Sequence, residues 1–126
     1  MTPKDNVKKK VLVADDNREL CENLKDILDS LGHQTFLAFD GQEAIEQFKD
    51  VHPDVVLLDI EMPEKDGFAV LKEIKRLAPE MRVLVLTANH NPYVADEIRR
   101  RGAAAVFTKP FDFKKVHRMI HEYGEC

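Results

Sequence analysis

Three carboxylates, one hydroxyl and one ammonium group closely follow short apolar runs of this sequence. Asp15 and Asp16 follow one run, Asp59 a second, Thr87 a third, and Lys109 comes just after a fourth. Uninterrupted apolar runs of this length are typical of strands buried on both faces of a parallel sheet. Because the carboxyl ends of parallel strands meet at one edge, where open α/β sheets bind ligands, we expect these side chains to converge.

Three converging carboxylates need compensation for their charge. At an effective dielectric of about 20, two like charges about 4 Å apart repel each other by about 4 kcal/mol. Either one carboxyl group is protonated or a cation occupies the site. Oxygen ligands at a partly open edge suit Mg²⁺, which keeps several waters and takes one or two carboxylates from the protein. The pattern therefore predicts a magnesium site.

An aspartate beside a cation, an ammonium group and a hydroxyl is equipped for phosphoryl transfer. The carboxylate attacks phosphorus while its neighbours stabilise charge on the phosphoryl oxygens. Each residue also has a plain structural interpretation. Asp15 and Asp16 suit the start of a helix, Asp59 suits a turn, and Thr87 and Lys109 suit a strand end and a surface turn. The joint pattern favours a site, because five such residues at the ends of four strands are not expected by chance.

Alternating elements position these residues. Helical spacing of apolar residues marks the segments from Leu20 to Leu31, Phe68 to Leu77 and Phe113 to Tyr123, and segments 41–50 and 91–102 are more weakly amphipathic. The run from Gln34 to Phe39 has the composition of an edge strand. Strands are predicted near 10–14, 34–38, 54–58, 82–86 and 104–108. Five strand–helix units imply one α/β domain over residues 1–126, a parallel sheet with helices on both faces.

Residues at the predicted helix ends agree with this division. Asn17, Asn91 and Asp112 are suitable N-caps. Gly32 and Gly102 fall where the first and fourth helices should stop, and glycine suits the left-handed position there.

Composition limits the kind of protein. The chain is 44% hydrophobic and 33% charged with a net charge of −4, which favours a folded domain and argues against nucleic-acid binding as its main task. The longest apolar runs fall short of the roughly 20 residues of a membrane span, and no signal peptide is recognisable. Cys21 and Cys126 alone form no disulfide framework, so we expect a cytoplasmic location.

The same residues form an ordered series of motifs. The series comprises Val13-Ala14-Asp15-Asp16-Asn17, Leu57-Leu58-Asp59-Ile60-Glu61-Met62-Pro63 with Asp66-Gly67, Leu86-Thr87-Ala88, and Thr108-Lys109-Pro110-Phe111. In this order and at these separations the chain resembles the receiver domains of two-component response regulators over essentially its whole length. The resemblance implies a flavodoxin-like fold with strand order 2-1-3-4-5 and a core at about residues 9–123. It also implies a stand-alone receiver, because little sequence follows the fifth helix.

The resemblance assigns the acidic residues. Asp59 is the implied phosphoacceptor, and Asp16 and Asp59 are the implied side-chain ligands of Mg²⁺. Asp15 is expected to act on the metal largely through water, and the backbone carbonyl of Glu61 completes the protein ligands.

It also assigns roles around the phosphoryl group. Thr87 and Lys109 would bind phosphoryl oxygens, and the peptide bond between Lys109 and Pro110 would be cis, which costs X–Pro bonds only about 0.5–1 kcal/mol. Gly67 would let the chain turn beside the site.

Three positions are specific to this chain. Many receivers carry an aromatic residue three positions before the lysine, but here that residue is Val106 and the neighbouring Phe107 points to the other face of the strand. We interpret Phe107 as core, and expect Thr87 to move without the usual aromatic rotation. Glu61 and Asn89 border the site. Glu61 either affects the lifetime of the acyl phosphate, which phosphate release from Glu61→Ala would test, or is a solvated loop residue.

Five histidines are scattered along the chain. His117 and His121 have the i, i+4 spacing that can bind a transition metal on a helix. Because the sequence places no third ligand with them, we interpret His117 and His121 as exposed surface residues.

The sequence therefore predicts a signalling phosphoacceptor and not an enzyme. A partner's phosphohistidine, on a sensor histidine kinase or a histidine phosphotransferase, would modify Asp59 with Mg²⁺. Modification would shift the surface around the fourth helix, the fifth strand and the fifth helix toward a downstream protein target or onward phosphotransfer. We expect a monomer or weak dimer without membrane or direct nucleic-acid contacts.

Two other functions fit the sequence less well. A phosphatase or phosphomutase with an aspartyl-phosphate intermediate carries its nucleophile after the first strand and has a cap, and this chain shows neither. Flavin binding is disfavoured, since a carboxylate-rich edge repels a flavin phosphate. The absence of a G-x-x-x-x-G-K-[ST] loop makes ATP binding unexpected.

Overall fold

Five parallel strands form one sheet in the order β2-β1-β3-β4-β5. A computed structural model describes residues 8–62 and 66–123, so Pro63 and Cys126 lie outside the described residues. The strands are β1 (Lys10–Ala14), β2 (Gln34–Ala38), β3 (Val55–Asp59), β4 (Arg82–Thr87) and β5 (Ala105–Thr108). The predicted class, order and strand positions are confirmed to within one residue, and β2 lies at an edge as expected.

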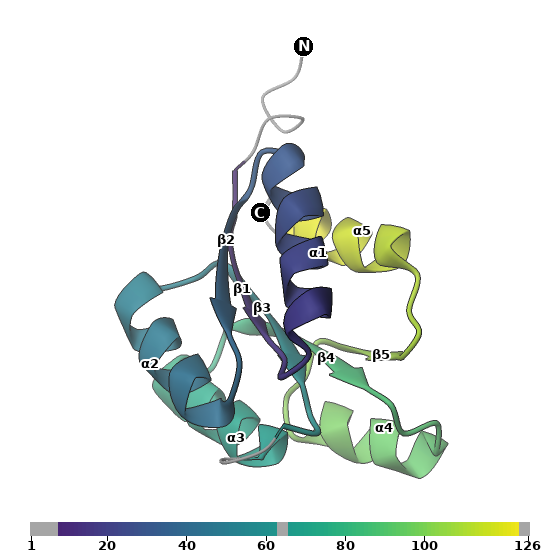
Figure 1. The fold of residues 1–126 in the computed structure, drawn as a ribbon. Helices are drawn as coiled ribbons and strands as arrows, with labels where there is room; N and C mark the ends of the chain where they lie inside the picture. Colours follow the sequence, from purple (N-terminus) through teal and green to yellow (C-terminus); the bar gives the residue numbers. More distant parts are fainter. Residues whose placement is uncertain (1–7, 63–65, 124–126) are drawn as a thin grey trace.

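Helices cover both faces of the sheet (Figure 1). They are α1 (Arg18–Ser30), α2 (Gly41–Val51), α3 (Gly67–Leu77), α4 (Pro92–Arg100) and α5 (Phe113–Tyr123). Helices α1 and α5 pack on one face of the sheet, and α2, α3 and α4 pack on the other. Alternate residues of the central strands enter these two cores, so that Leu12 and Val56 join α2–α4 whereas Val11 and Val55 join α1 and α5.

The edge strand β5 differs from the sequence prediction. The runs in β1, β3 and β4 are buried as predicted, but the residues of β5 are only half-buried or exposed. The prediction of a run buried on both faces was wrong for this strand, because only β4 pairs with it and its far edge has no neighbour in the sheet. Val106 and Phe107 pack on opposite faces of the sheet, and Phe107 contributes to the core shared with α1 and α5, as predicted.

The helix ends use the predicted residues. Asn17 and Asn91 cap α1 and α4 through their side chains, and Asp112 accepts from the N–H of Lys114 in the first turn of α5. Gly32 and Gly102 have φ of 95° and 108°, the left-handed backbone conformation that glycine adopts at no steric cost. No helix among residues 8–62 and 66–123 is both long and apolar enough to cross a membrane.

The two weakly amphipathic segments are both helical. Helix α2 buries Ala44, Ile45 and Phe48, and its side-chain cap is Asp40. Helix α4 buries Ile98 alone, which explains its weak apolar pattern. Helix α4 is therefore attached to the sheet by less apolar packing than α2.

Candidate functional site

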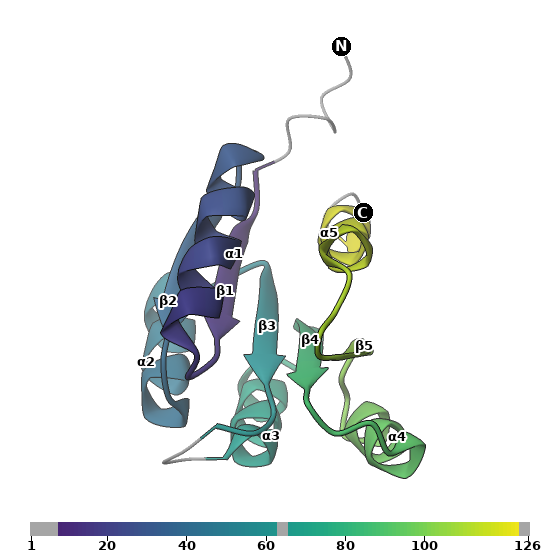
Figure 2. The ribbon, with the colours of Figure 1, turned by 45° about the vertical axis from the view of Figure 1, so that its right-hand side comes forward.

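The strands of the parallel sheet point the same way, so that their carboxyl ends lie at one edge (Figure 2), and the predicted acidic residues gather at this edge. Asp59 is the last residue of β3, and Asp15 and Asp16 follow β1 directly. The side chains of Asp15, Asp16 and Asp59 each offer an oxygen, and these oxygens lie within 4.8 Å of one another. Asp15 and Asp59 are buried, whereas Asp16 is exposed to solvent. The sequence prediction that these three carboxylates converge is confirmed.

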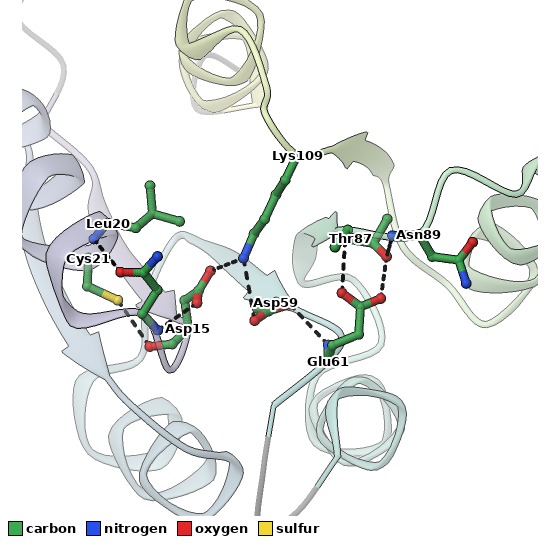
Figure 3. A network of polar contacts seen from close by, with 10 residues as sticks. Asp15, Leu20, Cys21, Asp59, Glu61, Thr87, Asn89 and Lys109 are labelled. Carbon is green, nitrogen blue, oxygen red and sulfur yellow. Dashed lines mark hydrogen bonds and ion pairs between the residues drawn. The ribbon is translucent and has the colours of Figure 1, made fainter.

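Asp15 is held on both carboxylate oxygens. The Nζ of Lys109 donates to Oδ2 at 2.7 Å, and the backbone N–H of Asn17 donates to Oδ1 at 2.9 Å. The thiol of Cys21 donates to the backbone carbonyl of Asp15 at 3.2 Å (Figure 3). Burial, together with the nearby Asp15 charge, raises the pKa of that thiol to about 12, so Cys21 stays protonated and able to donate. Asp15 is therefore a fixed, internally paired charge.

Lys109 lies between the two buried carboxylates. Its Nζ is 2.7 Å from Oδ2 of Asp15 and 3.5 Å from Oδ2 of Asp59. Burial acts to lower the pKa of Lys109, but the hydrogen bond and charge of Asp15, aided by Asp59, outweigh it and raise the pKa. The ammonium group is therefore charged throughout the physiological pH range.

Asp59 is a weaker acid than an ordinary aspartate, because its pKa is raised. Burial raises the pKa of this carboxyl group to about 6. The hydrogen bond from the Glu61 backbone N–H, at 3.0 Å, acts to lower the pKa, whereas the charge of Asp15 acts to raise it further. The carboxyl group is less completely compensated than that of Asp15, because its Oδ2 is farther from Lys109. Buried carboxyl groups with raised pKa values are typical of functional sites, since a purely structural site gains nothing from the cost of burying the charge.

Thr87 and Glu61 form the other half of the site (Figure 3). Thr87 ends β4 and is buried, and its hydroxyl donates to Oε2 of Glu61. The backbone N–H of Ala88 donates to Oε1 of the same carboxylate at 2.9 Å. Glu61 is exposed to solvent, as a loop residue would be, yet both of its carboxylate oxygens accept hydrogen bonds. Its effect on the lifetime of the acyl phosphate stays a prediction.

Gly67, at the start of α3, packs closely against the backbone of Ile60. The N–H of Gly67 donates to the carbonyl of Ile60 at 3.1 Å. A Cβ atom on Gly67 would lie 2.3 Å from the Cα of Ile60 and 2.5 Å from its carbonyl oxygen. Only glycine fits against this backbone, so steric contact with Ile60 is the reason for a glycine at this position.

The peptide bond between Lys109 and Pro110 is cis, as the sequence predicts. The backbone N–H of Lys109 also donates to the Thr87 carbonyl at 2.8 Å, which ties the two segments together. Two contacts were not anticipated. No sequence signal indicates the bond from the Cys21 thiol to the backbone carbonyl of Asp15. The bridge from Glu61 to Thr87 joins residues 26 positions apart, and only their shared position at strand ends suggests it.

The donor set fits a magnesium ion. The three grouped carboxylates offer hard oxygen atoms, the preferred ligands of Mg²⁺. Because Asp15 already accepts from Lys109 and Asn17, Asp16 and Asp59 are the carboxylates better able to bind a cation. Lys109 pairs with both Asp15 and Asp59, but its single positive charge does not balance the three carboxylates. The cluster therefore retains negative charge that a divalent cation would offset.

The prediction that His117 and His121 are exposed surface residues was wrong, because both are half-buried. His33 is buried, whereas His52 and His90 are exposed. Nε2 of His33 lies 3.1 Å from Nε2 of His117, and Nδ1 of His33 accepts from the Lys9 backbone N–H at 3.2 Å. Neutral His33 thus keeps its proton on Nε2 and donates it to His117. This arrangement leaves Nε2 of His33 unsuited to a metal.

Comparisons with known proteins identify the family. The profile of the response regulator receiver domain family matches residues 11–121. The chain is 35% identical over 118 residues to the chemotaxis protein CheY of Thermotoga maritima, covering 93% of this chain and 98% of that protein. It is 32% identical over 114 residues to the sporulation initiation phosphotransferase F of Bacillus subtilis, covering 90% and 92%. It is 38% identical over 112 residues to the transcriptional regulatory protein ZraR of Escherichia coli, covering 89% of this chain but only 25% of ZraR.

Solved structures agree. A Francisella response regulator 1452 receiver domain superposes with a TM-score of 0.88 at 29% identity over 93% of this chain and 97% of that one. CheY in a CheX–CheY–BeF3–Mg complex from Borrelia burgdorferi superposes with a TM-score of 0.83 at 30% identity, covering 90% and 87%. With the fold, the acidic cluster and these matches together, the chain belongs to the response regulator receiver domain family.

Proposed function

We propose that this chain is a phosphoacceptor of a two-component system or phosphorelay, modified at Asp59. One observation carries the proposal: the buried Asp59 carboxylate lies beside Lys109 on one side and near the Thr87 region on the other. An attacking carboxylate thus has a cation already in place to stabilise transferred phosphoryl oxygens. The names of relatives, a chemotaxis protein and a sporulation phosphotransferase, support a signalling role.

The reaction is a transfer from nitrogen to oxygen. A carboxylate oxygen of Asp59 forms a bond to the phosphorus of a partner's phosphohistidine, and the phosphorus–nitrogen bond breaks. The imidazole nitrogen keeps the electron pair of that bond, and Asp59 becomes an acyl phosphate. Lys109 and the Thr87 hydroxyl stabilise the negative charge of the phosphoryl oxygens. Because Asp15 holds the ammonium group of Lys109, this cation needs little rearrangement during the reaction.

Asp16 and Asp59, with the backbone carbonyl of Glu61, would hold Mg²⁺, and Asp15 would act on it largely through water. When bound, the ion supplies positive charge that offsets the carboxylates and the incoming phosphoryl group. The grouping of the three oxygens within 4.8 Å supports this assignment. The Mg²⁺ named in the Borrelia burgdorferi CheY complex supports the choice of metal.

The partners follow from this chemistry. The donor is a sensor histidine kinase or a histidine phosphotransferase, and the recipient is a downstream protein target or a second phosphotransferase. The output surface is α4-β5-α5. Its loose packing supports this choice, because α4 buries Ile98 alone, Tyr93 is 80% exposed and β5 is only partly buried. Phosphorylation would shift this surface between two states.

The decisive experiment is incubation with acetyl phosphate and Mg²⁺ followed by mass spectrometry of the intact protein. The wild type should gain one phosphoryl group, Asp59→Asn should gain none, and Asp50→Asn, on the exposed end of α2, should behave as wild type. Phosphorylation of Asp59→Asn to the wild-type extent would refute the assignment. A wild type that gives no product with acetyl phosphate is tested again with a phosphorylated histidine phosphotransferase.

We also infer that the chain is not a turnover enzyme and assists only its own phosphorylation and dephosphorylation. The competing function is a phosphatase or phosphomutase with an aspartyl-phosphate intermediate. Steady release of product from a small phosphoester such as p-nitrophenyl phosphate, lost in Asp59→Asn, would favour that alternative. A single modification from acetyl phosphate without such turnover favours the signalling role.

A further inference from the structure

Glu61 connects two loops of the site through its side chain (Figure 3). It lies two residues after β3, and its carboxylate reaches the end of β4. Oε2 accepts from the Thr87 hydroxyl and Oε1 accepts from the Ala88 backbone N–H at 2.9 Å. One planar anion thus fills a hydroxyl donor and an adjacent amide donor at the same time.

The Thr87 hydroxyl has no second proton to give. Its oxygen accepts from the Asn89 backbone N–H at 3.0 Å, and this bond orients the hydroxyl with its proton toward Glu61. A threonine hydroxyl carries one proton, so it cannot donate to Glu61 and to a phosphoryl oxygen together. The Thr87 hydroxyl, which the proposed function assigns to a phosphoryl oxygen, is therefore occupied by a residue of the chain itself.

We propose that Glu61 is an internal anion that competes with the phosphoryl group for Thr87 and Ala88, and that it leaves them when an anion binds at Asp59. The inference rests on the proposed function and adds a regulatory contact to it. The occupied state is unphosphorylated, with the β3–α3 and β4–α4 loops joined by Glu61. In the phosphorylated state Thr87 and Ala88 face the phosphoryl group, and the direct link between the loops is gone.

Two features make the exchange feasible. Glu61 is exposed to solvent, so its carboxylate can move into water without a buried charge being left unpaired. A phosphoryl group on Asp59 would be an anion close to Glu61 and would repel it. Phosphorylation of Asp59 thus weakens the contact of Glu61 with Thr87 and Ala88, the donors that the phosphoryl group would use. Glu61 therefore shifts the equilibrium toward the unphosphorylated state.

The test uses beryllofluoride with saturating Mg²⁺ as a phosphoryl mimic, monitored by amide NMR of the full chain. Glu61→Ala should bind it about tenfold more tightly than the wild type, since one hydrogen bond to a charged group contributes free energy of that order. Glu61→Gln keeps a single acceptor oxygen and should lie between the two. Glu46→Ala removes an exposed carboxylate of α2 that contacts Gln42 and should bind as the wild type does.

The Ala88 amide gives an independent readout. Without beryllofluoride its proton should shift upfield in Glu61→Ala, because a hydrogen bond to a carboxylate is lost, and should not shift in Glu46→Ala. Equal beryllofluoride affinity in wild type and Glu61→Ala overturns the proposal. So does tighter binding by both Glu61 variants to the same extent with an unmoved Ala88 amide, which would show an effect of charge alone. Failure of every variant, with Mg²⁺ bound, to bind beryllofluoride would contradict the proposed function instead.

Discussion

The two ends of the sheet bury ionisable groups in opposite ways. At the carboxyl end, Asp15 and Asp59 are buried around Lys109, and Asp59 has a raised pKa of about 6. At the amino end, His33 is buried between the Lys9 backbone and His117, and burial, with the charge of His117, lowers the pKa of His33. The first end keeps excess charge, whereas the second end keeps its imidazoles neutral.

This difference separates a site from a structural contact. Both ring nitrogens of neutral His33 are satisfied, one as acceptor and one as donor, so nothing further needs to bind. The carboxyl end has more carboxylates than Lys109 can balance. A bound cation would offset the remaining negative charge, and Asp59 would be free to react with a phosphoryl group. The excess charge costs stability and supplies the reactivity.

The largest expected effect comes from a substitution at the carboxyl end of the sheet. Asp59→Asn should abolish phosphoryl gain from acetyl phosphate and should also stabilise the folded protein at pH 7.5 without Mg²⁺. A folded-state pKa of about 6, against 3.8 for the free side chain, means that ionising Asp59 opposes folding by up to about 3 kcal/mol. Urea unfolding followed by circular dichroism measures the gain.

The sign of this effect depends on pH. Because the folded state binds the Asp59 proton more tightly, stability from this group falls as pH rises from about 4 to 6. The stabilisation by Asp59→Asn should therefore be largest at pH 7.5 and small at pH 4. An Asp59→Asn protein that is less stable than wild type at pH 7.5 would show that the buried charge is fully compensated.

The next prediction compares two glycines, one from each end of the sheet. Gly67→Ala should destabilise the protein by about 3 kcal/mol or more, because the new Cβ would meet the Ile60 backbone, which cannot move without displacing Asp59 and Glu61. Gly32→Ala has open space around its Cβ, and only its φ of 95° is unfavourable, so we expect a loss of about 1–2 kcal/mol. Equal losses in urea unfolding would contradict the steric explanation.

These glycines also illustrate what the sequence could reveal. The left-handed turn at Gly32 is a local property of the chain after a helix, so the pattern predicted it. The converging aspartates were predictable too, because apolar runs of β1 and β3 determine where their carboxyl ends lie. The contact of Gly67 with the Ile60 backbone was inferred only as a turn, since its atomic reason depends on the tertiary packing of α3.

Other features depended on tertiary structure alone. His33 and His117 are 84 residues apart, and no local pattern indicates that they meet. The half-exposed β5 followed from its position at the edge, because its apolar run resembles those of central strands. Glu61 and Thr87 could be placed at the same edge, but not in contact. Long-range side-chain geometry is what the sequence did not supply.

Magnesium should stabilise the folded protein through the carboxyl end of the sheet only. At a concentration ten times its dissociation constant, an ion bound to the folded state alone adds about 1.4 kcal/mol. We expect this increase in the wild type and a clearly smaller one in Asp16→Asn, which removes the exposed carboxylate of the cluster. Asp50→Asn should respond as the wild type does. Equal responses in all three proteins, measured by thermal unfolding at pH 7.5, would place the ion elsewhere.

The smallest expected effect concerns the amino end and has the opposite dependence on pH. His33 has a lowered pKa, so its contribution to stability is present above its ordinary value of about 6.5 and is lost as pH falls through the lower folded-state value. The test uses the Asp59→Asn variant, because this substitution removes the opposing titration. In that variant the free energy of unfolding should fall by about 1 kcal/mol between pH 7.5 and 5, which is the contribution of about one hydrogen bond. His33→Gln should reduce that loss, and the exposed His90→Gln should not. An unchanged slope in His33→Gln would assign the titration to His117, whose charge acts on His33 and whose own pKa is lowered by burial. A reduced slope would show that the amino end is stabilised by a neutral, fully bonded histidine, in contrast to the charged site across the sheet.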